Sequence, residues 1–373
     1  MLNPDDYILE ELTGQDDLET LKFDHTEYTP LEQLVELIRR LPTKRERVST
    51  KSLSVNGKVV ADKMEKYLAN PAESSSLLKE VLKSPRHYYL ARSNELPKKD
   101  AEYFELGTFI HSAVLEPKLF DKVILAPDLK LNSTKDCVSM IRFYWELLGL
   151  PEDITVYEWK IGELREEINR LNTLAKNEGF TFVKPLHQQI INVVRIGIKT
   201  YGNGIIPKLM NIVRPEISMY GTDSSTGLKV KIRPDGLLLE EDFGINAILS
   251  VKTTSATSVD MFLRDCAKYR YELAEGMYLQ VASEVTGRKF SGTLMLMVQN
   301  VAPFQVALLY WDAEDLQVGK YKYQHALSIV SECRKTKYFP GFDALAGEGC
   351  FGIIQAKLPD YIKKELPPQC VND

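Results

Sequence analysis

The stretch that decides the fold is Lys231-Ile232-Arg233-Pro234-Asp235-Gly236, followed by Ile248-Leu249-Ser250-Val251-Lys252-Thr253-Thr254. Asp235 ends one predicted strand, and Lys252 leaves the next. In a hairpin these two positions face each other at one end of the sheet. An acid at this place can hold Mg²⁺, which activates water. A lysine can orient that water or offset the charge of the transition state, so the pair suits phosphodiester hydrolysis. Taken alone, an acid in a Pro-Asp-Gly turn is more often structural.

Short strands and amphipathic helices surround this stretch. Leu228, Val230 and Ile232 alternate with charged residues, which is typical of a half-buried strand. We expect an antiparallel meander, then a helix, two strands and a last helix, which together make an α/β domain with a mixed sheet flanked by helices. The expected strands are 217–220, 228–232, 237–239, 247–251, 293–299 and 305–311, and the expected helices are 263–285 and 316–334.

The region before the strands is predicted to be helical. Ser75 or Ser76 can cap a helix, and Ser84-Pro85 supplies the cap and first position of another over 86–92. A further helix runs over 104–116 and stops at Pro117. We expect three parts: an N-terminal accessory extension over 1–70, the main domain over 71–343 with a mostly helical insertion over 126–214, and a tail over 344–373.

The N-terminal extension combines three kinds of sequence. It begins acidic, continues with leucines and an isoleucine at helical spacing over 31–38, and then carries a basic run over 39–47. The basic run fits a solvated linker better than an arm that contacts phosphates, but both interpretations stay open.

The composition is that of an ordinary globular protein, with 27% charged residues and a net charge of −5. A net acidic chain weighs mildly against nucleic acid, but a local basic cleft is enough for an enzyme that acts on DNA. The five cysteines are scattered without a CxxC pair, so we expect reduced thiols in a cytoplasmic protein. The acidic N-terminus does not predict a secretory signal, and we expect no membrane span.

Longer sequence patterns resemble the RecE (exonuclease VIII) family of nucleases over roughly 73–343. The resemblance implies a PD-(D/E)xK restriction-endonuclease-like core of the RecB-like branch. The matching segments are 75–78, 84–88, 106–117, 216–218, 226–228, 231–235, 251–254, 269–271, 304–307 and 339–342. The most specific parts are 106–117 and the run 231–254.

This resemblance implies roles for individual residues. Asp235 corresponds to the first catalytic and metal-binding acid, and Lys252 to the catalytic lysine. His111, which by itself would be interpreted as a core histidine, corresponds to a metal ligand, and the Val251 carbonyl joins the ligand set. Glu216 corresponds to an auxiliary acid, with a solvated charge as the alternative. Phosphate binding needs donors and positive charge, so we expect Thr253, Thr254 and Arg270 to line the DNA cleft with Lys252.

Two positions depart from the family pattern. Ser250 stands where the family has Asp or Glu, and Ala274 stands where it has the glutamine of Gln-x-x-x-Tyr, although Tyr278 is retained. Divalent cations prefer anionic oxygens, so Ser250 predicts a weakened site for Mg²⁺ or Mn²⁺. Glu275 is adjacent to the altered helix position and is one candidate for a displaced carboxylate. The other candidates are Asp242 and Asp260.

The expected function is a metal-dependent exonuclease that degrades double-stranded DNA from an end. The resemblance further implies phage or prophage recombination in the cytoplasm of a bacterial host, a ring-like homo-oligomer and a single-strand annealing partner. Because of Ser250 and Ala274, a weakened or inactive nuclease-fold protein that binds DNA is the main alternative. A phage assembly component that docks through residues 1–70 is a further one.

Overall fold

A five-stranded mixed sheet forms the centre of the molecule, with strand order β10-β9-β8-β7-β4. The computed structural model describes residues 24–96, 110, 123–183, 185–347 and 349–356. Strands β8 and β9 are parallel, and the other pairs in this sheet are antiparallel. The strands are β4 (Arg214–Pro215), β7 (Gly236–Leu238), β8 (Asn246–Thr254), β9 (Phe290–Gln299) and β10 (Val306–Tyr310).

A second sheet of three strands, in the order β1-β5-β6, lies beside the first. It contains β1 (Lys58–Val60), β5 (Ser218–Thr222) and β6 (Lys229–Ile232). The prediction of one continuous meander is therefore wrong, because the chain changes sheets between β6 and β7. Pro234 lies at this change, where it lacks a backbone donor and restricts the residue before it.

The described part of the N-terminal extension packs as part of the core. Strand β1 pairs with β5, and Leu34 and Leu53 are fully buried in the two main hydrophobic clusters. Of the basic run, Arg45 donates to the Val213 carbonyl at 2.7 Å, while the Glu46 amide bonds Asp242. The helices here are η1 (His25–Glu27), α3 (Leu31–Arg39) and α4 (Met64–Ala69).

The parallel pair β8–β9 is joined by a helical crossover, as parallel strands require. The predicted single helix over 263–285 is in fact two, α13 (Val259–Lys268) and α14 (Tyr271–Thr286). Arg270 separates them, because it adopts the left-handed conformation with φ 54° and so cannot continue the helix. This break was not visible in the apolar spacing.

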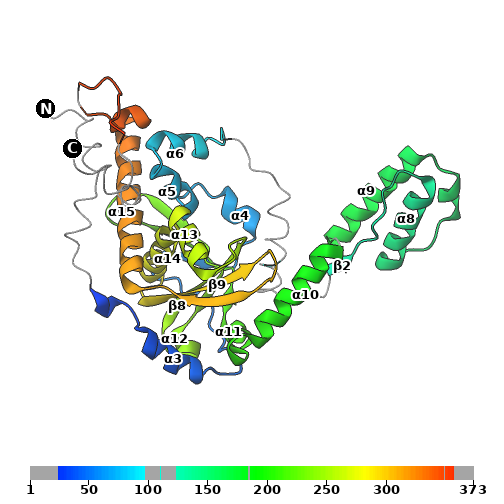
Figure 1. The fold of residues 1–373 in the computed structure, drawn as a ribbon, viewed down its shortest axis with the longest axis horizontal. Helices are drawn as coiled ribbons and strands as arrows, with labels where there is room; N and C mark the ends of the chain where they lie inside the picture. Colours follow the sequence, from blue (N-terminus) through cyan, green and yellow to red (C-terminus); the bar gives the residue numbers. More distant parts are fainter. Residues whose placement is uncertain (1–23, 97–109, 111–122, 184, 348, 357–373) are drawn as a thin grey trace, which may run out of the picture.

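Helix α14 packs against α15 (Ala313–Thr336), the long helix that runs along one side of the body (Figure 1). Two glycines allow the backbones to touch. A Cβ on Gly276 would lie 2.3 Å from the Lys320 nitrogen, and one on Gly319 would lie 2.0 Å from the Glu272 carbonyl oxygen. The close approach fixes the position of α14, which matters because α14 carries residues of the candidate site.

Gly319→Ala is expected to destabilise the protein by about 1–3 kcal/mol, because the added methyl group meets backbone that cannot rotate away. Gly162→Ala in α9 (Ile161–Asn177) is the matched control. No described atom lies within 4 Å of a Cβ added there, so it should be neutral or slightly stabilising. Urea unfolding midpoints measure both changes. An unchanged midpoint for Gly319→Ala would contradict the helix contact.

The insertion before the central strands is mostly helical, as predicted. Helices α8 and α9 pack around a small core of their own and stand away from the sheets, at the far end of α10 (Figure 1). Its elements are β2 (Val123–Leu125), α8 (Thr134–Leu148), η3 (Ile154–Glu158), α9 (Ile161–Asn177), β3 (Thr181–Val183), α10 (Pro185–Thr200), η4 (Tyr201–Asn203) and α11 (Ile205–Ile212).

Helices α5 (Ser75–Val81) and α6 (Pro85–Arg92) are anchored by the buried acid Glu73. Its carboxylate accepts from Tyr88 and Arg92 and pairs with Arg334 of α15. Ser84 caps α6 as predicted, by accepting from the His87 amide at 3.2 Å. Helix α5 differs from the prediction, because Ser74 is its N-cap residue and Ser75 lies inside the helix.

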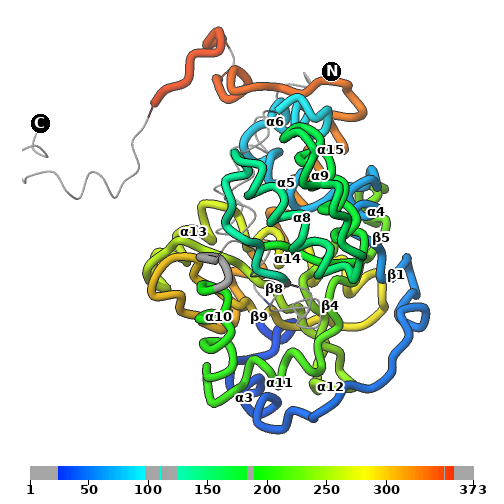
Figure 2. The backbone as a smooth tube through the Cα atoms, turned by 90° about the vertical axis from the view of Figure 1, so that its right-hand side faces the viewer, coloured from blue at the N-terminus to red at the C-terminus, as the bar shows by residue number. Residues whose placement is uncertain are grey.

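The remaining elements are α12 (Glu240–Phe243) and η5 (Phe342–Leu345). After α15 the chain leaves the body near α6 (Figure 2). The predicted helix over 104–116 lies outside the described residues except for Ile110. None of the described helices has the length and hydropathy that a membrane-spanning helix needs.

Candidate active site

The β7–β8 hairpin brings Asp235 and Lys252 together, as the sequence predicts. Gly236 pairs with Leu249, so Asp235 stands at the start of β7 beside the middle of β8. Its Oδ2 accepts from the Val251 amide at 2.5 Å and lies 3.4 Å from Lys252 Nζ. The backbone bond fixes the carboxylate, and the lysine provides its counter-charge.

The site contains a second carboxylate, which comes from helix α14. Ser250 and Lys252 share one face of β8, because side chains alternate along a strand. On that face Ser250 Oγ donates to Glu275 Oε1 at 2.7 Å, and both side chains are fully buried, with 0% exposure. Position 250 therefore carries a serine, and the carboxylate beside it comes from α14.

One oxygen of this carboxylate has no hydrogen-bond partner in the part of the chain that the structure describes. Glu275 Oε2 is buried and accepts no hydrogen bond from any described residue. An unsatisfied buried acceptor costs about 1–3 kcal/mol, and more when it is charged. A buried carboxylate oxygen of this kind, within a polar site, is typical of a carboxylate that binds a ligand.

Burial and neighbouring charges shift the pKa values of Glu275 and Lys252. Burial raises the pKa of Glu275 to about 7, assisted by Asp235 and opposed by Lys252 and by the Ser250 hydrogen bond. Burial alone would lower the pKa of Lys252, but Asp235 and Glu275 together raise it above its ordinary value. The lysine therefore stays protonated at neutral pH, whereas Glu275 is poised between its two forms.

Lys79 of α5 is a further cation in the site, and the sequence did not reveal it. Burial, followed by the charge of Lys252, lowers the pKa of Lys79 to about 8. The two ammonium groups lie over the same ring, with Lys79 Nζ 4.9 Å and Lys252 Nζ 5.7 Å from the Tyr271 centroid. The signal available in the sequence was that Lys79 follows Ser75, a residue of the matching segment 75–78, by one helical turn.

The other candidate acids, Glu216, Asp242 and Asp260, have surroundings different from those of Glu275. Glu216 accepts from Arg233 Nε at 2.6 Å, although its own amide bonds the Asp235 carbonyl. Asp242 forms a buried ion pair with Arg214 at 2.8 Å. Asp260 is exposed in the first turn of α13. Of the three acids considered for the displaced carboxylate, Glu275 is the one that reaches Ser250.

The residues expected to contact DNA or metal differ in their placement. Thr253 is half-buried and Arg270 is exposed. Thr254 is buried and its hydroxyl accepts from the Ala256 amide at 3.0 Å, so its side chain holds a turn and is not on the expected cleft surface. His111 lies outside the described residues, and its role as a metal ligand stays a prediction.

The donors in the site suit a hard divalent cation. The described residues contain no cluster of three or more His, Cys, Asp or Glu side chains able to hold a metal ion. They do bring together two carboxylates, Asp235 and Glu275, next to the Val251 carbonyl. Oxygen donors of this kind are preferred by Mg²⁺ and Mn²⁺, and the unpartnered Glu275 oxygen supports the fit.

The sheet, its flanking helices and the acid–lysine hairpin define a PD-(D/E)xK-like α/β domain, which confirms the predicted fold class. Comparison with known families agrees, because residues 206–348 match a family described as "PDDEXK-like domain of unknown function (DUF3799)".

Two solved structures are similar to the chain at low sequence identity. One, a protein from Eubacterium rectale described as a "putative exonuclease", is 12% identical, with a TM-score of 0.45 over 80% of this chain and 96% of that one. The other, named SSO0001, is 11% identical, with a TM-score of 0.20 over 58% of this chain and 84% of that one. No curated protein matches the chain.

The raised pKa of Glu275 predicts that metal affinity depends on pH. Below the pKa of about 7 the carboxyl group carries a proton, and above it the group is an anionic ligand. Mn²⁺ binding should therefore tighten as pH rises through neutrality and should release a proton at acidic pH. Calorimetry in two buffers of different ionisation enthalpy measures this release. An affinity that does not change with pH would contradict the assignment.

Proposed function

We propose that this protein is a divalent-metal-dependent nuclease that hydrolyses double-stranded DNA from its ends. The observation that carries the proposal is the contact of the Glu275 carboxylate with Ser250, beside Asp235 and Lys252. The carboxylate expected at position 250 is thus supplied from α14, so the substitution of serine does not by itself indicate an inactive protein. The nuclease-like fold gives independent support.

Each residue has a definite task in this reaction. Asp235, Glu275 and the Val251 carbonyl would hold Mg²⁺ or Mn²⁺, which supplies Lewis acidity toward a phosphate oxygen and toward water. Lys252 remains protonated and offsets the charge that develops on the phosphoryl group. Ser250 donates to Glu275 and thereby orients it.

Lys79 adds a second positive charge at the same place. Its ammonium group shares the Tyr271 ring with Lys252, although it belongs to a different element. Two cations beside one ring suit the binding of a phosphodiester, which brings negative charge to a site that already contains two acids. A local cluster of this kind also explains how a chain of net charge −5 can act on DNA.

The proposal is tested by incubating the protein with end-labelled linear duplex and with covalently closed circular duplex, in Mg²⁺ and in Mn²⁺. We expect nucleotides to be released from linear DNA alone, and Asp235→Ala to remove the activity. Cleavage of circular DNA would make the protein an endonuclease. Absence of cleavage with retained DNA binding would favour a non-catalytic DNA-binding protein.

The wider setting implied by the family resemblance also belongs to this proposal. It comprises recombination in a phage or prophage context, a ring-like homo-oligomer and a single-strand annealing partner. Sedimentation analysis with and without duplex DNA would detect the expected oligomer.

A further inference from the structure

The junction between α13 and α14 exposes an aromatic residue between two cations. Lys268, Tyr269 and Arg270 are all exposed, and 47% of Tyr269 is accessible. Arg270 has a left-handed backbone conformation between the two tyrosines, and the ring centroids of Tyr269 and Tyr271 are 6.0 Å apart with an angle of 31° between the ring planes. A non-glycine residue in this conformation is uncommon, and such positions occur often at functional sites.

The two rings lead from the surface to the catalytic lysine. Tyr271 is half-buried, and Lys252 Nζ lies 5.7 Å from its centroid. The outer ring carries its own cation, because Lys268 Nζ lies 5.3 Å from the Tyr269 centroid. Two neighbouring rings, each with an ammonium group beside it, thus connect the exposed junction with Lys252.

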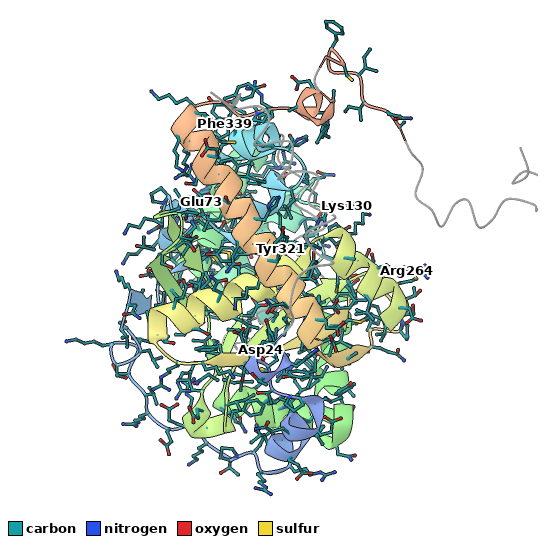
Figure 3. All side chains as sticks on the ribbon, turned by 90° about the vertical axis from the view of Figure 1, so that its left-hand side faces the viewer. Asp24, Glu73, Lys130, Arg264, Tyr321 and Phe339 are labelled. Carbon is teal, nitrogen blue, oxygen red and sulfur yellow. The ribbon has the colours of Figure 1, made fainter. Side chains whose placement is uncertain are left out.

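Neighbouring aromatic rings with cations beside them match the chemistry of an unpaired nucleic-acid strand. Bases stack on aromatic side chains whatever their sequence, while the phosphates between them pair with lysine and arginine. A paired base is less suitable, because both of its faces are already stacked inside the duplex. The surroundings extend the positive charge, since Arg264, one helical turn before Lys268 on α13, is exposed and points outward (Figure 3).

We propose that Tyr269 is a stacking platform for an unpaired base of the DNA strand whose phosphate reaches Lys252. The inference rests on the proposed nuclease function and adds a preference to it: the strand end must be unpaired at the site. Tyr269 is then a specificity-determining residue that acts on the strand and not on the metal.

The test measures binding and not cleavage. Oligonucleotides carry the fluorescent base 2-aminopurine near one end, either in a single strand or in a fully paired blunt-ended duplex, and divalent metal is removed with EDTA. We expect the wild-type protein to quench the single-stranded probe by stacking. Tyr269→Ala should weaken single-strand affinity by about 5-fold to 100-fold and should abolish the quenching.

Two further variants separate stacking from folding. Tyr269→Phe retains the ring and should bind like the wild type. Tyr157→Ala removes a tyrosine of similar exposure, 52%, from the helical insertion and should also have no effect. Thermal unfolding of each variant verifies that it is folded.

The outcomes distinguish this inference from the nuclease proposal. If Tyr269→Ala binds the single strand as the wild type does, or weakens both probes equally, the stacking inference is wrong even if linear duplex is still cleaved. If the wild type binds neither probe and cleaves no DNA, the nuclease function and the inference fail together.

Discussion

Glu275→Gln is expected to lose nearly all metal-dependent cleavage, with a rate reduced by about 10²–10³-fold. The change retains the shape of the side chain and the bond from Ser250, but it removes the negative charge. Since hard cations bind anionic oxygens, Mn²⁺ affinity should fall together with the rate. Titration calorimetry measures the affinity, and release of labelled nucleotides measures the rate.

Glu272→Gln is the matched control for this variant. Glu272 lies one turn earlier on α14 and is also buried, but it pairs with Lys322 of α15 at 2.8 Å and not with the site. It should bind Mn²⁺ like the wild type. Equal metal affinity in Glu275→Gln and the wild type would show that Glu275 is not a ligand.

Lys252→Met is expected to separate cleavage from metal binding. Lys252 Nζ lies 3.4 Å from Asp235 and its pKa is raised by both acids, so its positive charge is present at neutral pH. The Lys252 ammonium group competes with Mn²⁺ for Asp235. Mn²⁺ affinity should therefore be retained or increased when this charge is removed. The rate should still fall by about 10²–10³-fold, because the charge that forms on the phosphoryl group loses its counter-charge.

The comparison of the two variants gives the sharpest distinction. Glu275→Gln should lower both the Mn²⁺ affinity and the cleavage rate, whereas Lys252→Met should lower the cleavage rate alone. Lys322→Met changes a lysine that pairs with Glu272 outside the site and serves as the control. If Lys252→Met lost metal binding as well, its role would be to hold the hairpin together and not to assist hydrolysis.

The core of the site was predictable from local rules. A strand alternates its side chains and a hairpin aligns its two strands, so the positions of Asp235 and Lys252 determine their proximity. The capped helix at Ser84-Pro85 and the helical insertion were equally predictable, because capping residues and apolar spacing are local signals.

The source of the second carboxylate was not predictable in the same way. Helical spacing shows which residues share a face of α14, but not which face meets β8. That orientation depends on the contact of Gly276 and Gly319 with the opposite backbones and on the break at Arg270. Sequence therefore left Glu275 as one of three candidates, and the packing of α14 selected it.

Long-range packing also explains two other differences. The predicted meander divides into two sheets because β6 pairs with β5, whereas β7 pairs with β8 and β4. The sequence did not indicate a role for Lys79, because a lysine on a short helix is usually solvated. Its burial follows from the anchoring of α5 by Glu73, which joins elements distant in sequence.

The most direct test places a carboxylate at position 250 of β8 and removes the carboxylate at position 275 of α14. Ser250→Asp alone places a second acid within hydrogen-bond distance of Glu275 and should weaken Mn²⁺ binding through repulsion. Glu275→Ser alone should weaken it by loss of the ligand. We expect the double variant, Ser250→Asp with Glu275→Ser, to bind Mn²⁺ more tightly than either single variant. If Ser250→Asp alone tightened binding and Glu275→Ser had no effect, the claim that Glu275 supplies the missing carboxylate would be contradicted.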